Sequence, residues 1–417
     1  MTSPALEQLA GRVRSAARVV ARAPSSVRDD ALRLAADLLE EEGPALVEAN
    51  RADLERAEAA GMAEAARDRL RLTPDRVGGM AGGLRKVAAL PDPVGEVVEG
   101  WVRPNGLRVS RVRVPLGVVG VIYENRPNVS SDAAGLCLKA GNAAFLRGSS
   151  SAIDSNQAVV ALLRRAAVKA GLPEDAVALV EDTSHETAVA FMRLRGFIDC
   201  LIPRGGQALI ASLVEHATVP YVLDGDGNCH IYIDGAADLA MAHELTLNAK
   251  THRFGVCNAV ETILVHADVA ADFLPRLAAS LATAGVEIRA DERVLAYVPD
   301  AVPALEDDFA TEFLGPVVAI GMVDDVGDAI EHIARYSSGH SEAIVTSDVA
   351  TADRFVAEVD GAAVLVNAST RFVDGEELGL GAEVGISTQK LHARGPMGVK
   401  ELTTLKWVVR GDGQVRR

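Results

Sequence analysis

Cys257 has the surroundings of a reactive thiol. It stands in the stretch 252-HRFGVCNAVETILVH-266, and Lys250, His252 and Arg253 precede it within a few residues. Nearby cations lower the pKa of a thiol and raise the fraction of nucleophilic thiolate. Free Cys is also among the most buried residue types and is often inert. The local pattern alone therefore leaves two alternatives open, a nucleophile or a buried structural thiol.

Composition excludes several classes of protein. The chain has 417 residues, 49% of them hydrophobic and 24% charged, with a formal net charge of −16. These values are typical of a soluble globular protein with two or three domains. The acidic balance predicts no nucleic-acid partner, because such proteins present a basic face. The apolar runs, such as 114-VPLGVVGVIY-123, are too short to span a membrane.

The cysteine pattern predicts reduced thiols. Cys137, Cys200, Cys229 and Cys257 are widely spaced, and no secretory signal is visible. We therefore expect a cytoplasmic protein without disulfides. A metal site built from the Cys229 and Cys257 regions would lack a close pair of ligands, so we predict no metal.

The first half of the chain predicts helices followed by a parallel α/β unit. Residues 1–90 carry apolar residues at helical spacing, as in 28–42 and 45–61, which predicts amphipathic helices. From 117 onward, continuous apolar runs alternate with helical segments, which predicts a parallel sheet buried on both faces. The layout is of the doubly wound, dinucleotide-binding type, although G-x-G-x-x-G is absent. The expected strands are 117–124, 143–147, 176–180, 197–203 and 219–224, and the expected helices are 131–140, 154–170, 185–195 and 207–216.

A second α/β unit is expected to begin near residue 228. The Gly-rich segment 369–398 follows this unit and predicts a functional loop. The expected helices of the unit are 236–252, 268–284, 325–335 and 350–358, and the expected strands are 259–265, 316–321, 342–346 and 363–367.

Residues 96–115 predict a β-hairpin around Asn105-Gly106, the strongest short-range turn signal for such a structure. The alternation slips at Ser110-Arg111, which predicts a bulge there. A surface arm and an oligomerisation flap both fit this basic hairpin. The tail 401–411 alternates as a strand that would add to a sheet edge.

The whole chain resembles the aldehyde dehydrogenase superfamily, and within it the γ-glutamyl phosphate reductase branch. The resemblance implies an α/β fold with two doubly wound domains plus a β-hairpin oligomerisation flap, and a homo-oligomer. The implied nucleotide-binding domain spans 1–95 and 116–227, the catalytic domain 228–385, and the flap 96–115 and 400–417. The motifs that carry the resemblance are 114-VPLGVVGVIYENRPNV-129, 141-GNAAFLRGSSSA-152, 252-HRFGVCNA-259, 311-TEFLGPV-317, 332-HIARYSSGHSEAIVT-346 and 381-GAEVGISTQKLHARGPMG-398.

The resemblance makes Cys257 the nucleophile. It implies attack on the acyl phosphate of L-glutamate 5-phosphate, loss of phosphate and a thioester that NADPH reduces to the semialdehyde, a step toward proline. Asn125 lies where the superfamily carries an oxyanion donor, a position that often differs in the reductase branch. The backbone N–H of Cys257 is an alternative donor.

A missing residue favours phosphate over water as the acyl partner. Hydrolytic aldehyde dehydrogenases carry a water-activating Glu at a stretch that matches 222-VLDGDGN-228, where this chain has Asp224 and Asp226. Both Asp residues flank Gly and suit turns. A hydrolytic enzyme is the alternative that this absence disfavours.

Further site residues follow from the resemblance. Arg147, Ser149 and Ser150 suit the 2′-phosphate of NADP, because Arg makes charge-assisted bonds to phosphate. Gly205 and Gly206 open a helix whose start suits the cofactor's pyrophosphate. Glu312 matches the residue that holds the nicotinamide ribose. The candidates for substrate binding are Arg126, Asn128, His252, Arg253 and Glu383, and glutamate 5-kinase is a candidate partner.

Overall fold

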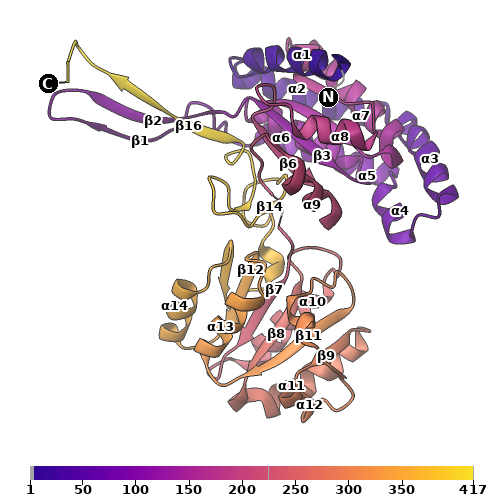
Figure 1. Ribbon diagram of the computed structural model, residues 1–417, viewed down its shortest axis with the longest axis vertical. Coiled ribbons are helices and arrows are strands. Elements are labelled where there is room, and N and C mark those ends of the chain that lie inside the picture. Colours follow the sequence, from indigo (N-terminus) through magenta and orange to yellow (C-terminus); the bar gives the residue numbers. More distant parts are fainter. Residues whose placement is uncertain (1–3, 224, 417) are drawn as a thin grey trace. The chain divides into compact units, whose positions relative to one another are not determined.

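The computed structural model describes residues 4–223 and 225–416, with the elements shown in Figure 1. These residues divide into two compact units. The first consists of Met1–Leu223, Gly379–Gly385 and Met397–Arg417, and the second of Asp224–Leu378 and Ile386–Pro396. Residues 379–385, which the sequence analysis places in the catalytic domain, belong to the first unit.

Amphipathic helices begin the first unit, as the apolar spacing predicts. In α1 the buried residues Leu6, Ala10, Val13 and Ala17 recur every three or four positions, so they share one face. Thr73 caps α5, and its hydroxyl accepts a hydrogen bond from the backbone of Arg76. The five helices are α1 (Pro4–Val20), α2 (Ser25–Glu41), α3 (Gly43–Ala59), α4 (Glu64–Leu70) and α5 (Pro74–Ala89).

The sheet of the first unit is parallel, as predicted, with the strand order β5-β4-β3-β6. Helices α1, α8 and α9 pack on the face that carries Val118 and Phe145. Helix α6 contacts β3 and β4, and α7 contacts β5. The strands are β3 (Val118–Tyr123), β4 (Ala143–Gly148), β5 (Val177–Leu179) and β6 (Cys200–Arg204), and the helices are α6 (Asn128–Lys139), α7 (Ile153–Lys169), α8 (His185–Met192) and α9 (Gln207–His216), with short 3₁₀ turns η1 (Ser150–Ala152) and η2 (Glu174–Ala176).

The strand predicted at 219–224 is wrong for its described residues. Tyr221 makes a single parallel bridge to Leu201, and no longer ladder forms in 219–223. Pro220 lacks an N–H group and cannot extend a ladder. Asp224 lies outside the described residues.

The sheet of the second unit is also parallel, with the order β10-β9-β11-β8-β7-β12-β13. Its strands are β7 (Cys229–Ile233), β8 (Val260–His266), β9 (Glu287–Ala290), β10 (Val302–Pro303), β11 (Val317–Val323), β12 (Ser341–Val345) and β13 (Ala363–Val366). The helices are α10 (Leu239–Thr251), α11 (Ala267–Thr283), α12 (Glu292–Leu295), α13 (Val326–Tyr336) and α14 (Val349–Glu358), with η3 (Glu306–Ala310).

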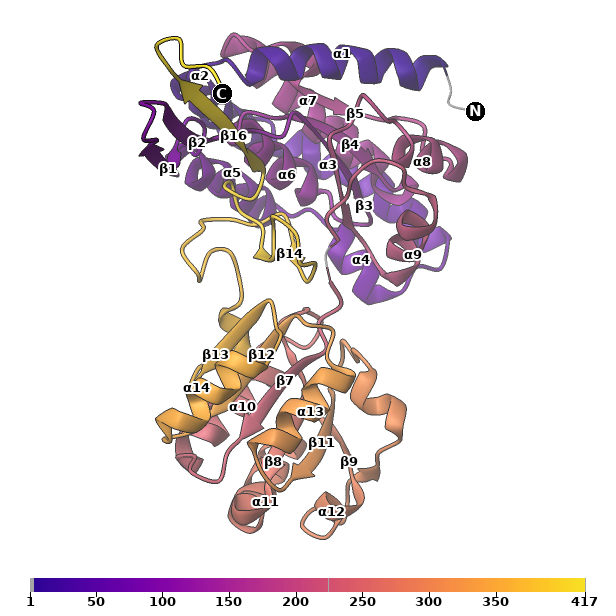
Figure 2. The ribbon, with the colours of Figure 1, turned by 60° about the vertical axis from the view of Figure 1, so that its left-hand side comes forward.

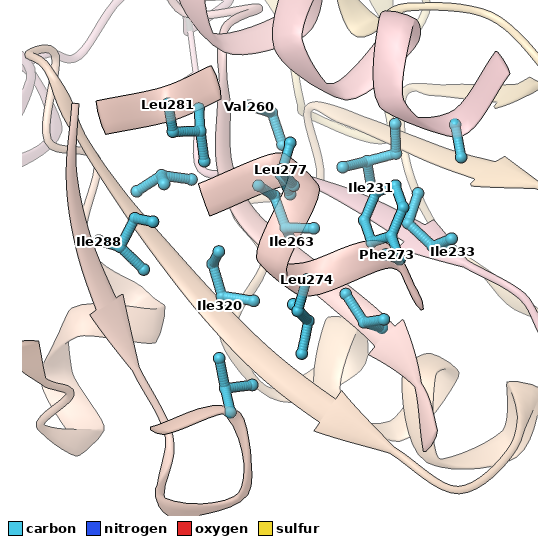
Figure 3. Close-up of a cluster of buried hydrophobic side chains, with 14 of the residues drawn as sticks. Ile231, Ile233, Val260, Ile263, Phe273, Leu274, Leu277, Leu281, Ile288 and Ile320 are labelled. Carbon is cyan, nitrogen blue, oxygen red and sulfur yellow. The ribbon is translucent and has the colours of Figure 1, made fainter. Parts of the chain in front are cut away.

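Helices cover both faces of this second sheet (Figure 2). Ile231, Ile233 and Ile263 pack with residues of α10 and α11, and Figure 3 shows this aliphatic cluster around Phe273. Tyr232 points to the opposite face and packs with residues of α13 and α14. The alternation along β7 therefore produces the doubly wound arrangement that the sequence predicts.

Strands β1 (Val97–Val102), β2 (Arg108–Pro115) and β16 (Thr403–Arg410) form the antiparallel sheet that we call the flap. Figure 1 shows them extending away from the helices of the first unit. The bulge predicted on β2 is wrong, because the extra residue is Val98 on β1. The central strand β2 is bonded to β16 in unbroken register, so the irregularity falls on the edge strand.

The Gly-rich segment 369–398 contains only short elements in its described structure. These are η4 (Thr370–Phe372), β14 (Ile386–Ser387) and β15 (Gly395–Pro396). Gly379, Gly381 and Gly385 have positive φ angles, which glycine adopts without strain. In the described parts of the chain, no helix is both long and apolar enough to cross a bilayer.

Candidate active site

Cys257 lies on the loop between α10 and β8, and its backbone is fixed from two sides. The thiol of Cys229 donates a hydrogen bond to the carbonyl oxygen of Cys257 over 3.1 Å. A Cβ atom at Gly227 would lie 1.8 Å from the same oxygen, so only glycine fits there. The loop is thus held against the start of β7 and cannot shift without breaking these contacts.

Cys257 also differs from the other thiols in exposure. Cys257 is half-buried, whereas Cys137, Cys200 and Cys229 are buried. Burial raises the pKa of Cys200 to about 12 and raises the pKa of Cys137 and Cys229 as well. Buried neutral thiols are poor nucleophiles, so the exposure of Cys257 favours it as the reactive one.

The residue after Cys257 anchors a distant segment. Asn258 donates from its side-chain amide to the carbonyl of Val373 over 2.9 Å. Its own carbonyl accepts from the hydroxyl of Thr370 over 2.7 Å. These bonds hold η4 beside the loop of Cys257.

Arg371, within η4, is a cation that the sequence analysis missed. Its Nε donates to Nδ1 of His252 over 3.3 Å. Burial lowers the pKa of Arg371, the negative charges of Asp374 and Cys257 oppose this, and the charge of Arg253 adds to it. Arg371 therefore lies within electrostatic range of Cys257. A basic residue in a Gly-rich loop was the available signal, but nothing in the spacing linked it to Cys257.

Glu312 lies in the same unit and close to the same backbone. Its Oε1 accepts a hydrogen bond from the backbone N–H of Gly227 over 2.8 Å, the residue that packs on Cys257. Leu314, two residues later, has a φ of 50°. Its N–H donates to Glu261 over 3.2 Å, so Glu261 helps to hold the loop that carries Glu312.

Glu261 is paired with Lys250 in the interior. Both side chains are fully buried and joined by an ion pair. Burial raises the pKa of Glu261 to about 7 although Lys250 opposes the rise, and burial lowers the pKa of Lys250. Lys250, near Cys257 in sequence, thus serves Glu261 rather than standing as an unpaired cation.

In the first unit, Asn125 and the serines after β4 come together. The side-chain oxygen of Asn125 accepts hydrogen bonds from the hydroxyls of Ser149, over 3.5 Å, and Ser151. Its backbone N–H donates to Ser149 over 3.3 Å. Asn125 has a φ of 45°, a conformation that Asn tolerates better than most residues. Ser150 is exposed and begins η1.

Arg147 lies at the end of β4 and is half-buried. Its Nη2 donates to the backbone carbonyls of Thr183, over 2.7 Å, and Ser184, over 3.0 Å. Burial lowers the pKa of Arg147, and the charges of Asp182 and Glu124 oppose this. The guanidinium is therefore fixed in direction by backbone oxygens.

Gly205 and Gly206 lie between β6 and α9, and an internal carboxylate occupies this turn. Oε2 of Glu124 accepts from the N–H of Gly206 over 3.0 Å. A Cβ atom at Gly205 would lie 2.6 Å from the same oxygen and 2.7 Å from Leu209. The helix start thus binds an anion already, as its dipole favours.

The predicted substrate-binding residues divide between the units. Asn128 donates to Asp132 over 2.9 Å at the start of α6, and burial raises the pKa of Asp132 to about 6. Half-buried Arg126 and Glu383 belong to the first unit with Asn128, whereas His252 and Arg253 are exposed and belong to the second.

The sequence analysis expects turn-forming Asp residues before β7, and it expects no metal site. Asp226 is exposed, and Asp224 lies outside the described residues. Within residues 4–223 and 225–416, no three His, Cys, Asp or Glu side chains are grouped so that they would hold a metal ion.

Comparison with known proteins identifies the relatives of this fold. The model of the aldehyde dehydrogenase family matches residues 2–296 and 294–408. The gamma-glutamyl phosphate reductase of Moorella thermoacetica is 55% identical over 406 residues, 97% of each chain. That of Thermobifida fusca is 53% identical over 411 residues, 99% of this chain and 98% of the other.

A solved structure agrees with these matches. The crystal structure of gamma-glutamyl phosphate reductase from Thermotoga maritima superposes with a TM-score of 0.97 and 47% identity, covering 99% of this chain and all of that chain. This likeness confirms the predicted α/β, aldehyde dehydrogenase-like fold. The chain belongs to the aldehyde dehydrogenase family, and within that family to the gamma-glutamyl phosphate reductases.

Proposed function

We propose that this chain reduces L-glutamate 5-phosphate to L-glutamate 5-semialdehyde and phosphate with NADPH, the second step from glutamate to proline. The names of its relatives support this reaction, and the similarity to them extends over nearly the full length of the chain. The observation that carries the proposal within the molecule is the half-buried thiol of Cys257 on a backbone held by Gly227 and Cys229.

Cys257 performs the covalent step. Its thiolate attacks the carbonyl carbon of the acyl phosphate, a C–S bond forms, and the C–O bond to phosphate breaks. Phosphate departs with the electron pair of that bond and leaves a thioester. When bound, NADPH would supply a hydride to this thioester. Cys257 would then leave as the thiolate, because the C–S bond breaks when the aldehyde is released.

The oxyanion formed at the carbonyl needs fixed hydrogen-bond donors. The backbone N–H of Cys257 is one candidate, on a loop that two neighbours hold in place. The amide of Asn125 is the other. Ser149 and Ser151 bind its oxygen, and this orients the NH₂ group away from them as a donor.

We expect residues at the carboxyl ends of β3, β4 and β6 to bind the nicotinamide dinucleotide. Gly205 leaves no side chain at the start of α9, where a Cβ atom would collide with Glu124. Arg147 and the exposed Ser150 would hold a 2′-phosphate, and this charge favours NADPH over NADH. Glu312 would hold the ribose hydroxyls of the nicotinamide, on a loop tied to Gly227.

The reverse reaction tests this proposal directly. Reduction of NADP⁺ by glutamate 5-semialdehyde is followed with and without inorganic phosphate. The proposal requires phosphate, because phosphate must cleave the thioester. Turnover that proceeds equally well without phosphate would mean that water cleaves the thioester, and the chain would be a hydrolytic aldehyde dehydrogenase.

The flap is proposed to join copies of the chain into a homo-oligomer. Trp407 is 58% exposed and Val97 59% exposed. Trp407 meets Trp101 edge to face and lies under the guanidinium of Arg111. Exposed aromatic and apolar side chains on a sheet edge are typical of an association surface. Trp407→Asp should lower the mass measured by light scattering, and an unchanged mass would contradict the proposal.

A further expectation rests on the same chemistry. An acyl phosphate hydrolyses readily, so we propose that glutamate 5-kinase, which makes it, contacts this enzyme in the cytoplasm. Co-sedimentation of the two purified proteins checks the contact, and independent sedimentation at micromolar concentration would contradict it.

A further inference from the structure

Cys257 lies at the amino end of β8, where a thiolate and a bound acyl phosphate would both carry negative charge. Cys257 follows α10, which ends at Thr251 and has His252 as its C-cap. The carboxyl end of a helix carries a partial negative charge, which disfavours a thiolate and a phosphate ester nearby. The nearby Lys250 is already paired with Glu261. Side-chain cations from elsewhere must therefore balance the negative charge of a bound acyl phosphate.

Arg371 is placed to supply that charge. Two hydrogen bonds to Asn258 hold the segment of Arg371 beside Cys257. Thr370 and Asn258 are buried, so water does not compete for these bonds. Arg371 itself remains half-exposed, and its hydrogen bond to His252 uses Nε. In the described residues, its two terminal nitrogens donate no hydrogen bond to the protein.

We propose that Arg371 binds the phosphate group of the acyl phosphate substrate, and so is a substrate-binding residue that assists departure of phosphate. This inference rests on the proposed function. The guanidinium offers two parallel N–H donors that match two phosphate oxygens. Negative charge grows on the phosphate as the C–O bond to it breaks, so a cation there stabilises the departing group more than the ground state.

The position of Arg371 favours the phosphate over the substrate carboxylate. The phosphate is bonded to the carbon that Cys257 attacks, whereas the α-carboxylate lies at the other end of the glutamyl chain. Arg371 directly follows Thr370, which is bonded to Asn258, the residue after Cys257. We therefore expect its guanidinium to lie near the phosphate. Exposed Arg253, which also interacts with Arg371, would raise the positive potential at the same place.

Steady-state kinetics of the reverse reaction test the inference. Arg371→Met and Arg371→Lys are compared with Arg354→Met, which removes an exposed Arg of α14 that pairs with Glu358 in the same unit. The KM for inorganic phosphate should rise roughly 10- to 100-fold in Arg371→Met and less in Arg371→Lys, as expected for loss of charge-assisted bonds. In the Arg371 variants the KM for the semialdehyde should change by less than about twofold. In Arg354→Met the KM for phosphate should also change by less than about twofold.

A second readout does not depend on turnover. Phosphate should slow the alkylation of Cys257 by iodoacetamide in wild type. In Arg371→Lys a higher phosphate concentration should be needed for the same protection, and in Arg371→Met phosphate should give none. Circular dichroism and the midpoint of urea unfolding verify that the variants fold.

Three results would overturn the inference. One is an unchanged KM for phosphate in Arg371→Met. Another is a rise confined to the KM for semialdehyde, which would assign Arg371 to the carboxylate. The third is a shift of the alkylation pH profile with phosphate protection intact, which would make Arg371 an activator of the thiol. Phosphate-independent turnover of wild type would instead refute the proposed function itself.

Discussion

The two units place their candidate site residues at opposite edges of their parallel sheets. In the first unit, Asn125 follows β3 and Gly205 follows β6, at the carboxyl ends of the strands. In the second, Gly227 precedes β7, Cys257 precedes β8 and Glu312 precedes β11, at the amino ends. Open α/β sheets usually bind ligands at the carboxyl ends, so only the first unit follows the common rule.

This difference determines how each unit holds negative charge. Helix starts surround the carboxyl edge of the first sheet, and Gly206 at the start of α9 already binds the carboxylate of Glu124. A helix end precedes Cys257 at the amino edge of the second sheet. At the start of α9 a backbone N–H therefore holds an anion in the first unit, whereas we expect the second unit to depend on side-chain cations such as Arg371.

The largest expected effect is a loss of activity that distinguishes Cys257 from Cys229, two cysteines at the amino edge of the second sheet. Cys257→Ala should lower kcat by more than about a thousandfold, because covalent catalysis is lost. NADPH binding, measured by fluorescence titration, should stay within about threefold of wild type. Cys229→Ala removes the buried neighbour that donates to Cys257 and should cost activity only about 2- to 10-fold, because it loosens the loop without removing the nucleophile.

Two outcomes would contradict the view that Cys257 is the nucleophile and Cys229 its structural neighbour. Residual turnover of Cys257→Ala above about a thousandth of wild type would show that the thioester is dispensable. If Cys229→Ala were as inactive as Cys257→Ala while still binding NADPH, the two thiols would act together.

The next effect tests the buried ion pair of the second unit. Lys250→Met leaves the carboxylate of Glu261 buried without its cation, which should lower the free energy of unfolding by about 3 to 5 kcal/mol. The double variant Lys250→Met/Glu261→Leu should be less destabilised, since neither charge remains. Urea unfolding measures both.

The matched change at the carboxyl edge should cost much less. Glu124→Gln keeps an acceptor for the N–H of Gly206, so we expect a loss of stability below about 1 kcal/mol. Equal losses in Glu124→Gln and Lys250→Met would contradict the view that the units hold charge differently.

The sequence predicted most of the fold, because buried parallel strands leave clear apolar runs. It did not predict β7, β9 or β10. In β9 charged Glu287 and Arg289 alternate with Ile288 and Ala290, and β10 has two residues, so neither shows a continuous apolar run. The bulge was assigned to the wrong strand because alternation does not show which strand is central. Pairing partners are determined only by tertiary structure.

The candidate site was predictable to different degrees in the two units. Cys257 and Glu312 were found through motifs, and the structure brings both to the backbone of Gly227. Arg371 was missed because its segment reaches the loop of Cys257 only through tertiary contacts. Thr370 and Val373 are bonded to Asn258, and Arg371 is bonded to His252, all across more than 100 residues of sequence. Periodicity reports local structure and carries no information about such contacts.

A moderate effect is expected for the cofactor at the carboxyl edge. Arg147→Leu removes the cation proposed for the 2′-phosphate and should raise the KM for NADPH roughly 10- to 30-fold while the KM for NADH changes little. Steady-state kinetics with both cofactors measure the ratio. Equal changes for both would mean that Arg147 only supports the loop of Thr183 and Ser184, whose carbonyls it binds.

The smallest effect concerns Asp132, a half-buried carboxylate of the first unit. Asn128 and Ser131 donate hydrogen bonds to it. Burial raises its pKa from 3.8 to about 6, although these bonds and the charge of Arg204 oppose the rise. Between these pH values the folded chain keeps a proton that the unfolded chain releases. The free energy of unfolding therefore falls, through this group, as the pH rises from about 4 to about 6.

Asp132→Asn removes that dependence, because the amide does not ionise. The variant should match wild type near pH 4 and exceed it by about 1 to 2 kcal/mol above pH 6, less than the full pKa shift implies because Asp132 is not completely shielded from solvent. Urea unfolding at pH 4.5, 6 and 8 measures the difference, with exposed Asp75→Asn as the control for loss of one charge. A variant less stable than wild type at pH 8 would mean that Asp132 is charged and stabilised in the folded chain. The first unit would then also stabilise an anion by specific pairing, and the contrast with Glu261 and Lys250 would disappear.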